Sequence, residues 1–226
     1  MPDLPSQWTP VALVADLPVA TSAGTVLQGA EVVIWRDSAG RVHAWEDRCP
    51  HRGMKLSFGF VRGDRIACLY HGWQYDGAGV CRYIPAHPEL EVPASICVPA
   101  HAAAEALGMV WVAAAGTDPG SLPPGGAEPL RSLFVEAPLE VLVGLAQAGL
   151  PGAGAVTEAR RDGALLHLSQ GGTRIAAGMH PMGPGAAALH LVLPAGASED
   201  RRLALVTAAA GLRRAAEAAA GTGEAA

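Results

Sequence analysis

The chain has 226 residues, of which 50% are hydrophobic and 16% are charged, and its formal net charge is −5. This composition can bury a core, and it argues against global disorder. The acidic balance and the lack of any Lys/Arg block disfavour nucleic acid and membranes as partners. Residues 1–10 lack a secretory-signal pattern, and no apolar stretch is long enough to span a bilayer. We therefore expect a cytoplasmic protein whose four cysteines are metal ligands or free thiols rather than disulfides.

Short strands separated by Gly and Pro are predicted throughout the first half of the chain. The first is a hairpin, in which 32–36 and 41–46 flank a turn at 37–40. Further strands are expected at 65–70, 73–75, 80–84, 95–98 and 109–113. This spacing favours a small antiparallel β structure.

The second half is built differently, because every Trp and Tyr lies before residue 112. A Pro/Gly-rich linker is predicted at 117–130. After it we expect a small α+β domain over 131–219 and a disordered tail at 220–226. Its predicted elements are a strand at 131–136, a helix at 138–148, strands at 164–169, 173–178 and 187–193, and a helix at 198–219. Ser198 is the predicted cap of the last helix.

Two short segments combine cysteine with histidine at close spacing. One reads Cys49-Pro-His51 and the other Cys68-Leu-Tyr-His71. Thiolates are the usual ligands of iron–sulfur clusters, and replacing two of them by neutral imidazoles raises the reduction potential. Each segment gives one Cys and one His, so the pairs can hold a two-iron cluster from opposite sides.

Zinc is the competing interpretation of these four residues. Structural zinc usually takes Cys-x2–4-Cys followed by His-x3–5-His. Here Cys and His alternate, with one residue between them in the first segment and two in the second. This order favours the iron–sulfur cluster over zinc, and over four unrelated core residues.

The stretch from Trp8 to Gly116 resembles the N-terminal Rieske domain of the Rieske non-haem iron oxygenases. The matching pieces are CPHRG at 49–53, ACLYHGWQYDGAGVC at 67–81, Pro85, and GMVWV at 108–112. The resemblance implies a mainly β domain over 1–116 with two cluster-binding loops. It also implies one Rieske-type [2Fe–2S] cluster, with Cys49 and Cys68 on one iron and His51 and His71 on the other.

Further positions refine this resemblance. Arg52, Tyr70 and Trp73 match residues that surround the cluster, although ordinary β-domain packing explains them equally well. Respiratory-chain Rieske proteins carry an extra, disulfide-bonded Cys in each loop, where this chain has Met54 and Tyr70. It is therefore similar to the oxygenase and ferredoxin branch. Cys81 and Cys97 are predicted to be free, partly buried thiols.

A complete oxygenase of this family also holds a mononuclear iron through two His and one carboxylate. The histidines that follow these segments, His87, His101, His167, His180 and His190, include no pair within nine residues. We therefore assign no catalytic residue, and we interpret 131–219 as a reduced relative of the family's helix-grip shell. His167 and His190 are expected to be core or edge residues, although distant ligands can converge in a fold.

The favoured function is that of an electron-transfer component. A reductase or ferredoxin would be its electron donor, and an oxygenase subunit its acceptor. Transfer between subunits in the family is compatible with a homo- or hetero-oligomer. Two alternatives stay open: a self-contained oxygenase with an atypical mononuclear iron site, and a redox-sensing or structural subunit. The oxidoreductase component is preferred over a complete oxygenase.

Overall fold

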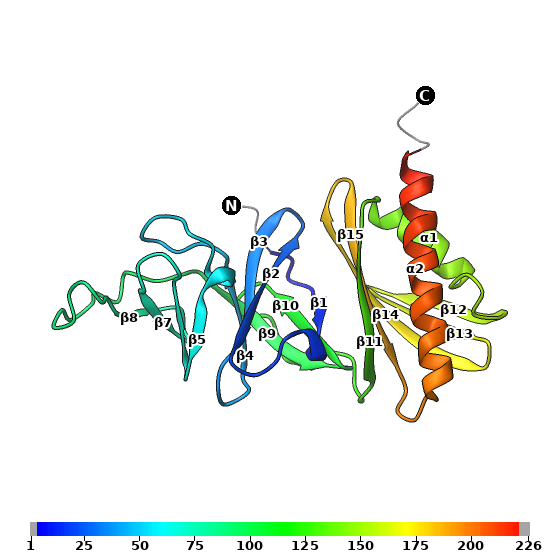
Figure 1. Ribbon diagram of the computed structural model, residues 1–226, viewed down its shortest axis with the longest axis horizontal. Helices are drawn as coiled ribbons and strands as arrows, with labels where there is room; N and C mark the ends of the chain where they lie inside the picture. Colours follow the sequence, from blue (N-terminus) through cyan, green and yellow to red (C-terminus); the bar gives the residue numbers. More distant parts are fainter. Residues whose placement is uncertain (1–3, 222–226) are drawn as a thin grey trace. The chain divides into compact units, whose positions relative to one another are not determined.

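The computed structural model describes residues 4–221, which form two compact units. The first contains residues 15–104 together with two short pieces. One piece ends at Gln7 and the other spans Val112–Gly120. The second contains Trp8–Val14, Glu105–Trp111 and the chain from Ser121 onward. Strands dominate the fold, and the two α-helices both belong to the second unit (Figure 1). Neither of these helices is long and apolar enough to cross a membrane.

The strands form three sheets, and the five-stranded and four-stranded sheets are antiparallel throughout. The six-stranded sheet has the order β1-β10-β9-β4-β3-β2, the five-stranded sheet β11-β15-β14-β13-β12, and the four-stranded sheet β5-β6-β7-β8. Their bounds are β1 Thr9–Leu13, β2 Thr21–Leu27, β3 Ala30–Arg36, β4 Val42–Glu46, β5 Phe60–Arg62, β6 Arg65–Ala67, β7 Gln74–Asp76, β8 Cys81–Tyr83, β9 Ala100–Ala106, β10 Met109–Ala113, β11 Glu128–Val135, β12 Val156–Asp162, β13 Leu165–Gln170, β14 Thr173–Gly183 and β15 Ala186–Leu193.

The hairpin β3–β4 is confirmed, and it forms one wall of the core of the first unit. Val33 pairs with Trp45, and Trp35 with His43, as the two-residue alternation requires. The side chains of Val33, Trp35 and Trp45 are almost fully buried. They share one apolar cluster with Ile66 and Tyr75 of the four-stranded sheet. The large aromatic residues of the first half therefore supply this core.

Two predictions in the first half need correction. The strand expected at 65–70 ends at Ala67, because the chain turns into a loop at Cys68. Residues 95–98 form no strand but only an isolated bridge between Val80 and Cys97. Pro93 and Pro99 enclose this segment, and the Ile96 N–H donates to the Pro93 carbonyl in a turn, which leaves too little chain for a ladder.

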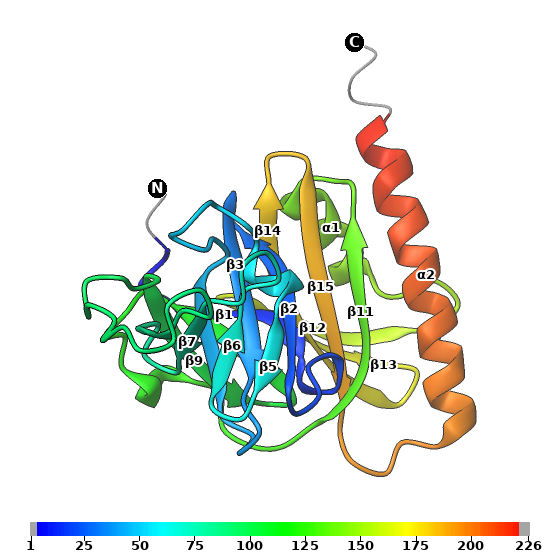
Figure 2. The same cartoon turned by 60° about the vertical axis from the view of Figure 1, so that its left-hand side comes forward.

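The second unit packs two helices on one face of the five-stranded sheet, as Figure 2 shows. Helix α1 spans Leu139–Ala148 and α2 spans Glu199–Gly221. Buried apolar side chains of both helices, among them Leu142 and Leu205, meet those of β13–β15 in one core. Ser198 caps α2 as predicted, since its Oγ accepts the Arg201 N–H at 3.3 Å.

The sequence missed several strands, of which β12 is the clearest case. Its residues read VTEARRD and are mostly exposed, so no apolar alternation marks them. At the other end, α2 includes residues 220 and 221, and the rest of the tail predicted at 220–226 lies outside the described residues. The predicted fold class, a mainly β N-terminal part and a small α+β C-terminal part, is confirmed.

Candidate metal centre

The four predicted ligands lie on two loops. Each loop is closed by its own hydrogen bond, and the bond joins equivalent positions in the two loops. The first loop follows β4 and precedes the short 3-10 helix Leu56–Phe58, and the second joins β6 to β7. The Cys49 carbonyl accepts the Gly53 N–H at 2.8 Å, and the Cys68 carbonyl accepts the Gly72 N–H at 2.9 Å. The loops are thus two copies of one turn, although His is the third residue of the first and the fourth of the second.

Both turns require glycine at their fifth position. The φ angles of Gly53 and Gly72 are +73° and +71°, in the left-handed region that other residues adopt only at a cost. Each loop is closed further by its cysteine N–H, which donates to the carbonyl of Met54 in the first loop and of Trp73 in the second. The shared Cys-x3-Gly spacing is therefore a signal in the sequence that indicates two matched loops.

The two cysteines meet in the interior of the first unit. Cys49 is 2% exposed and Cys68 is 3% exposed, and their side chains are in hydrogen-bond contact. Burial raises the pKa of the Cys68 thiol, while the backbone N–H groups of Tyr70 and His71 act to lower it. Backbone donors aimed at a sulfur stabilise the thiolate, which is the form that binds metal.

The two histidines meet nearer the surface. The ring centroids of His51 and His71 are 4.5 Å apart, and the His51 ring stacks on Trp73 of the second loop at 4.3 Å. His71 is exposed, and the exposed Tyr70 packs on it at 3.9 Å. Burial, followed by the charges of His71 and Arg52, lowers the pKa of His51 and favours neutral imidazole, the form that binds metals.

This donor set fits a two-iron cluster better than a single ion. Among the residues described, no three His, Cys, Asp or Glu side chains gather as a site for one metal ion. The ligand-type side chains come instead as a thiol pair and an imidazole pair. The Nδ1 atom of His51 is buried and accepts no hydrogen bond from any described group, as suits a ring nitrogen that serves as a ligand. The residues therefore fit the cluster that the sequence predicts.

Comparison with known families gives the same assignment. The model of the Rieske [2Fe-2S] domain matches residues 7–95, which include both loops. The chain carries a Rieske domain. Such a domain implies a Rieske-type [2Fe–2S] cluster, so the recognition and the cofactor predicted from the sequence are confirmed.

The relatives of this Rieske domain include Rieske non-haem iron oxygenases. Over 107 residues, 47% of this chain, it is 42% identical to oxidoreductase NdmD of Pseudomonas putida, and this match covers 18% of NdmD. It is 37% identical to protein TIC 55 of Arabidopsis thaliana over 111 residues, which cover 49% of this chain and 21% of that protein. The matched stretch therefore spans only about a fifth of these longer relatives.

The likeness to solved structures extends beyond the Rieske domain. Dicamba monooxygenase bound to dicamba superposes with a TM-score of 0.77 at 18% identity, over 95% of this chain and 86% of that one. NdmA of Pseudomonas putida bound to caffeine gives a TM-score of 0.70 at 18% identity, over 93% and 81%. At these identities the likeness concerns the fold alone, and it covers the second unit as well.

Tyr75 is a site residue that the sequence analysis missed. Its hydroxyl lies 3.1 Å from the Cys49 sulfur, and its side chain is fully buried. Burial, and then the hydrogen bond with Cys49, raises the pKa of the Tyr75 hydroxyl far above its usual range, so it stays protonated. A protonated hydroxyl beside a thiolate sulfur can only donate to it. Tyr75 is therefore placed to stabilise negative charge on Cys49.

Replacing Tyr75 by phenylalanine is expected to lower the midpoint potential of the Rieske centre. Reduction adds negative charge to the centre, so a hydrogen bond to the Cys49 sulfur stabilises the reduced state more than the oxidised one. A difference of about 1 kcal/mol corresponds to roughly 40 mV for one electron. Spectroelectrochemical titration measures the shift. Tyr83→Phe, on β8 and half-buried, is the control. An unchanged potential in Tyr75→Phe would show that the hydrogen bond has no such effect.

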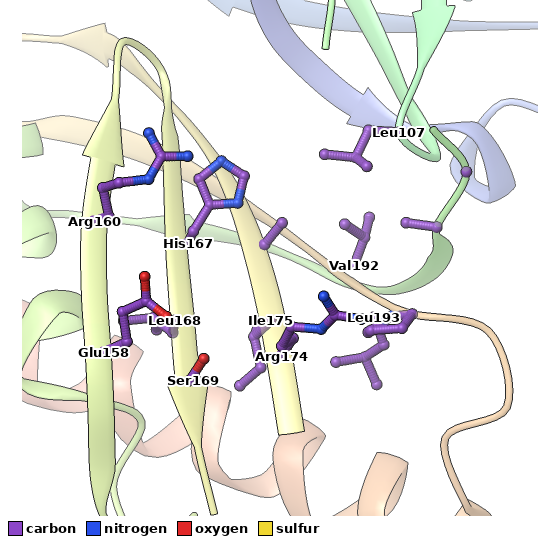
Figure 3. Close-up of a pocket in the computed structure, with 14 residues that line it drawn as sticks. Leu107, Glu158, Arg160, His167, Leu168, Ser169, Arg174, Ile175, Val192 and Leu193 are labelled. Carbon is purple, nitrogen blue, oxygen red and sulfur yellow. The ribbon is translucent and has the colours of Figure 1, made fainter. Parts of the chain in front are cut away.

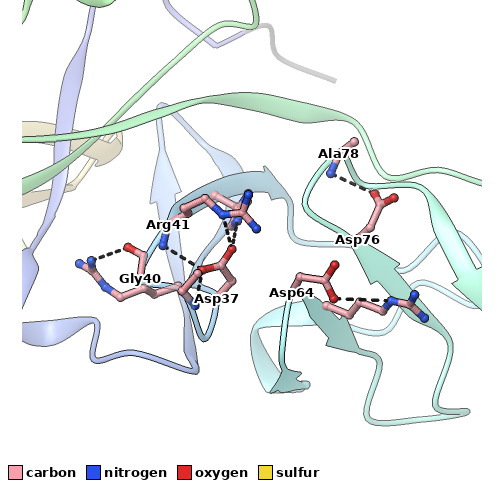
Figure 4. Close-up of polar contacts among 10 residues, drawn as sticks. Asp37, Gly40, Arg41, Asp64, Asp76 and Ala78 are labelled. Carbon is pink, nitrogen blue, oxygen red and sulfur yellow. Dashed lines mark hydrogen bonds and ion pairs between the residues drawn. The ribbon is translucent and has the colours of Figure 1, made fainter.

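A buried carboxylate holds the β3–β4 turn (Figure 4). Asp37 accepts the N–H groups of Ala39 and Arg41 at 2.9 Å and the Arg41 guanidinium at 2.7 Å, and His43 lies 3.3 Å away. Burial alone would raise the pKa of Asp37, but the hydrogen bonds of Arg41 and His43 and the charge of Arg41 together lower it to about 2. The neighbouring Ser38 N–H donates to the Gly63 carbonyl and so joins this turn to the β5–β6 turn.

Asp37→Asn is expected to lower the free energy of unfolding by about 1.5–3 kcal/mol at neutral pH, because it removes charge-assisted hydrogen bonds. The pKa of Asp37 is lower in the folded chain than its ordinary 3.8, so its stabilisation is complete above that pH and is lost as the pH falls toward 2. Denaturant unfolding from pH 7 to pH 2 measures both effects. The control is Asp64→Asn, at a side chain that is 67% exposed. An equal loss in both variants would contradict this account.

The other two cysteines differ in their surroundings. Cys81 is fully buried and pairs with Tyr75 across β7 and β8, whereas Cys97 is exposed. Burial raises the pKa of the Cys81 thiol, which disfavours the reactive thiolate. Neither cysteine forms a disulfide. Both are free thiols as predicted, but the predicted partial burial is wrong, since Cys81 is fully buried and Cys97 is exposed.

The histidines of the second half of the chain belong to the second unit. His180 and His190 are fully buried, and their rings stack with centroids 5.5 Å apart. The Nδ1 of His190 is 2.9 Å from the Ser132 hydroxyl, and burial, then the charge of His180, lowers the pKa of His190 to about 3. His167 lies on β13 and is half-buried. Of the three, only His180 and His190 come together, as core residues.

Proposed function

We propose that Cys49, Cys68, His51 and His71 hold the Rieske cluster, and that the chain is a one-electron carrier. The observation that carries the proposal is the meeting of two buried sulfurs and two more exposed imidazoles on matched loops. When bound, a Rieske cluster supplies one reversible electron at a potential raised by its histidine ligands. Cys49 and Cys68 would take the iron on the buried side. His51 and His71 would take the iron nearer the surface, where a partner can approach.

The exposed side of the site suits a transient partner. Leu69 and Tyr70, next to His71, are 49% and 57% exposed. Apolar side chains beside a redox centre allow close approach without a large desolvation cost. We infer that a reductase or ferredoxin gives the electron and that a partner oxygenase centre takes it. A homo- or hetero-oligomer with an oxygenase subunit is one form of this arrangement.

The arrangement of the remaining histidines supports a carrier over a self-contained oxygenase. A mononuclear iron site needs two His and one carboxylate around one point. One ring nitrogen of His190 is in hydrogen-bond contact with the Ser132 hydroxyl, and the His190 ring stacks on the ring of His180. Within residues 4–221, no Asp or Glu joins this pair in a metal-binding group. We propose further that the protein acts in the cytoplasm, where the free thiols of Cys81 and Cys97 stay reduced.

Iron and labile sulfide per chain, measured with the purified full chain, test the proposal. Two irons, two sulfides and a Rieske-type EPR signal after reduction support the carrier. A third iron per chain, with product formed by the isolated chain, would replace the carrier by a complete oxygenase. Zinc without labile sulfide would refute the cluster assignment. Rapid reversible reduction by a reductase separates a carrier from a sensor or structural subunit.

A further inference from the structure

Strand β12 forms one edge of the five-stranded sheet, and its side chains are exposed from Thr157 to Asp162. Its neighbour in the sheet is β13, and among the residues described no further strand covers its outer side. An uncovered edge presents main-chain N–H and C=O groups that can pair with another strand. The other edge strand, β11, is interrupted by Pro129 and a shift of register, both of which oppose such pairing. Of the two edges of this sheet, β12 is therefore the better able to accept a strand.

The hairpin that joins β12 to β13 determines which main-chain groups of β12 face the open edge. Asp162 and Leu165 flank its two-residue turn. In an antiparallel hairpin of this kind, the pair that flanks the turn is hydrogen-bonded, and bonded pairs then alternate with unbonded ones along the strands. By this alternation, Arg160 turns its N–H and C=O toward β13. The N–H and C=O groups of Ala159 and Arg161 point to the open edge.

The charges on this edge match those of a second copy of the same strand. Two copies related by a two-fold axis perpendicular to the sheet pair antiparallel, with one residue opposite its own copy. If that residue is Ala159, then Glu158 of each copy lies opposite Arg160 of the other, and such opposite-charge pairs stabilise a sheet. The register shift of β12 lies before Glu158, so this stretch is regular. Centring the pair on Glu158, Arg160 or Arg161 would instead set like charges against each other.

The ion pairs that β12 already makes leave this contact open. Glu158 and Arg160 line the same face of β12 (Figure 3), where the Arg160 guanidinium lies 3.2 Å from the Asp162 carboxylate. Both side chains of that ion pair are more than half exposed, and exposed ion pairs contribute little stability. The Arg161 guanidinium contacts Glu140 of α1, on the helix side of the sheet. Arg160 can therefore turn to Glu158 of a second copy at little cost.

We propose that two copies of this chain associate through β12, with Ala159 at the two-fold axis. Their five-stranded sheets then form one continuous sheet. Main-chain hydrogen bonds at Ala159 and Arg161 provide the pairing, and the two contacts between Glu158 and Arg160 determine its register. An interface one strand wide is small, so we expect a concentration-dependent dimer rather than a permanent one. This association goes beyond the proposed electron transfer, since every residue of β12 belongs to the second unit.

Sedimentation equilibrium of the full, cluster-loaded chain, from about 1 μM to about 1 mM, tests the proposal. Glu158→Arg and Arg160→Glu should each weaken self-association about ten-fold or more, because each turns both charge pairs into repelling ones. The two changes shift the net charge in opposite directions, so a shared loss cannot come from net charge. The double variant Glu158→Arg/Arg160→Glu restores both pairs and should associate within about three-fold of the unchanged chain. An equimolar mixture of the two single variants should form mixed dimers, because each Arg then meets a Glu.

Amide hydrogen exchange locates the interface. At high concentration the N–H groups of Ala159 and Arg161 should exchange more slowly, whereas that of Arg160, which already faces β13, should not change. A chain that stays monomeric up to about 1 mM would overturn the proposal, and so would single variants that associate as the unchanged chain does. Equal protection of Ala159 and Arg161 at every concentration would mean that another occupant covers the edge, and it would also overturn the dimer. Cluster iron and the EPR signal, recorded on the same samples, report separately on the proposed function.

Discussion

Cys68→Ser is expected to abolish the Rieske cluster, leaving less than about a tenth of the iron and labile sulfide of the unchanged chain. A serine hydroxyl is a hard, weakly acidic oxygen, and it cannot replace a soft thiolate at an iron–sulfur centre. Iron and sulfide assays and the EPR spectrum of the reduced protein measure the loss.

Cys97→Ser provides the matched control, because it makes the same substitution at an exposed cysteine. It should retain two irons per chain. The far-UV circular dichroism of both variants shows whether the second unit, which holds both α-helices, stays folded. A folded Cys68→Ser protein with a full Rieske signal would exclude Cys68 as a ligand. Loss of the cluster in both variants would point to general instability rather than to ligation.

The ligand loops were predictable because their chemistry is local. Four ligand-type residues within 23 positions, from Cys49 to His71, carry the pattern in their identity and spacing alone. The structure adds their arrangement, in which thiol meets thiol and imidazole meets imidazole. That pairing joins residues of different loops, so it depends on how β6 and β7 place the second loop against the first.

Tyr75 and Asp37 show what the sequence could not provide. The contact of Tyr75 with Cys49 spans 26 residues and exists only because the four-stranded sheet turns this side chain into the core. In the sequence, Tyr75 is recognisable only as an aromatic residue of a predicted strand. Asp37 occupies a turn, where Asp is common for local reasons, and its burial follows from the packing of the β3–β4 hairpin.

The missed strands share a physical cause. β12 is polar and exposed at a sheet edge, and β9 is rich in alanine, which has low strand propensity and packs little volume. Both are strands because their neighbours offer a hydrogen-bonding edge. Runs of largely buried apolar residues mark β3, β13 and β15. Where burial leaves no periodic pattern in the sequence, pairing with neighbouring strands decides whether a segment becomes a strand.

Leu205→Ala is expected to lower the free energy of unfolding of the second unit by about 2–5 kcal/mol, the range for deleting a fully buried leucine side chain. Leu205 is fully buried on α2, in the core shared with α1 and the five-stranded sheet. This core contains no aromatic side chain, so each leucine provides a large share of its volume. Denaturant unfolding followed at 222 nm measures the effect, because both α-helices belong to this unit.

Leu203→Ala supplies the matched control on the same helix, since Leu203 is 66% exposed. It should change the free energy of unfolding by less than about 0.5 kcal/mol. The two variants remove the same atoms and have nearly the same helix propensity, so their difference isolates burial. Similar effects in the two variants would show that α2 does not pack on the sheet through Leu205. A large loss in Leu205→Ala alone, with the slope of the denaturant dependence unchanged, would establish that this helix face supports the second unit.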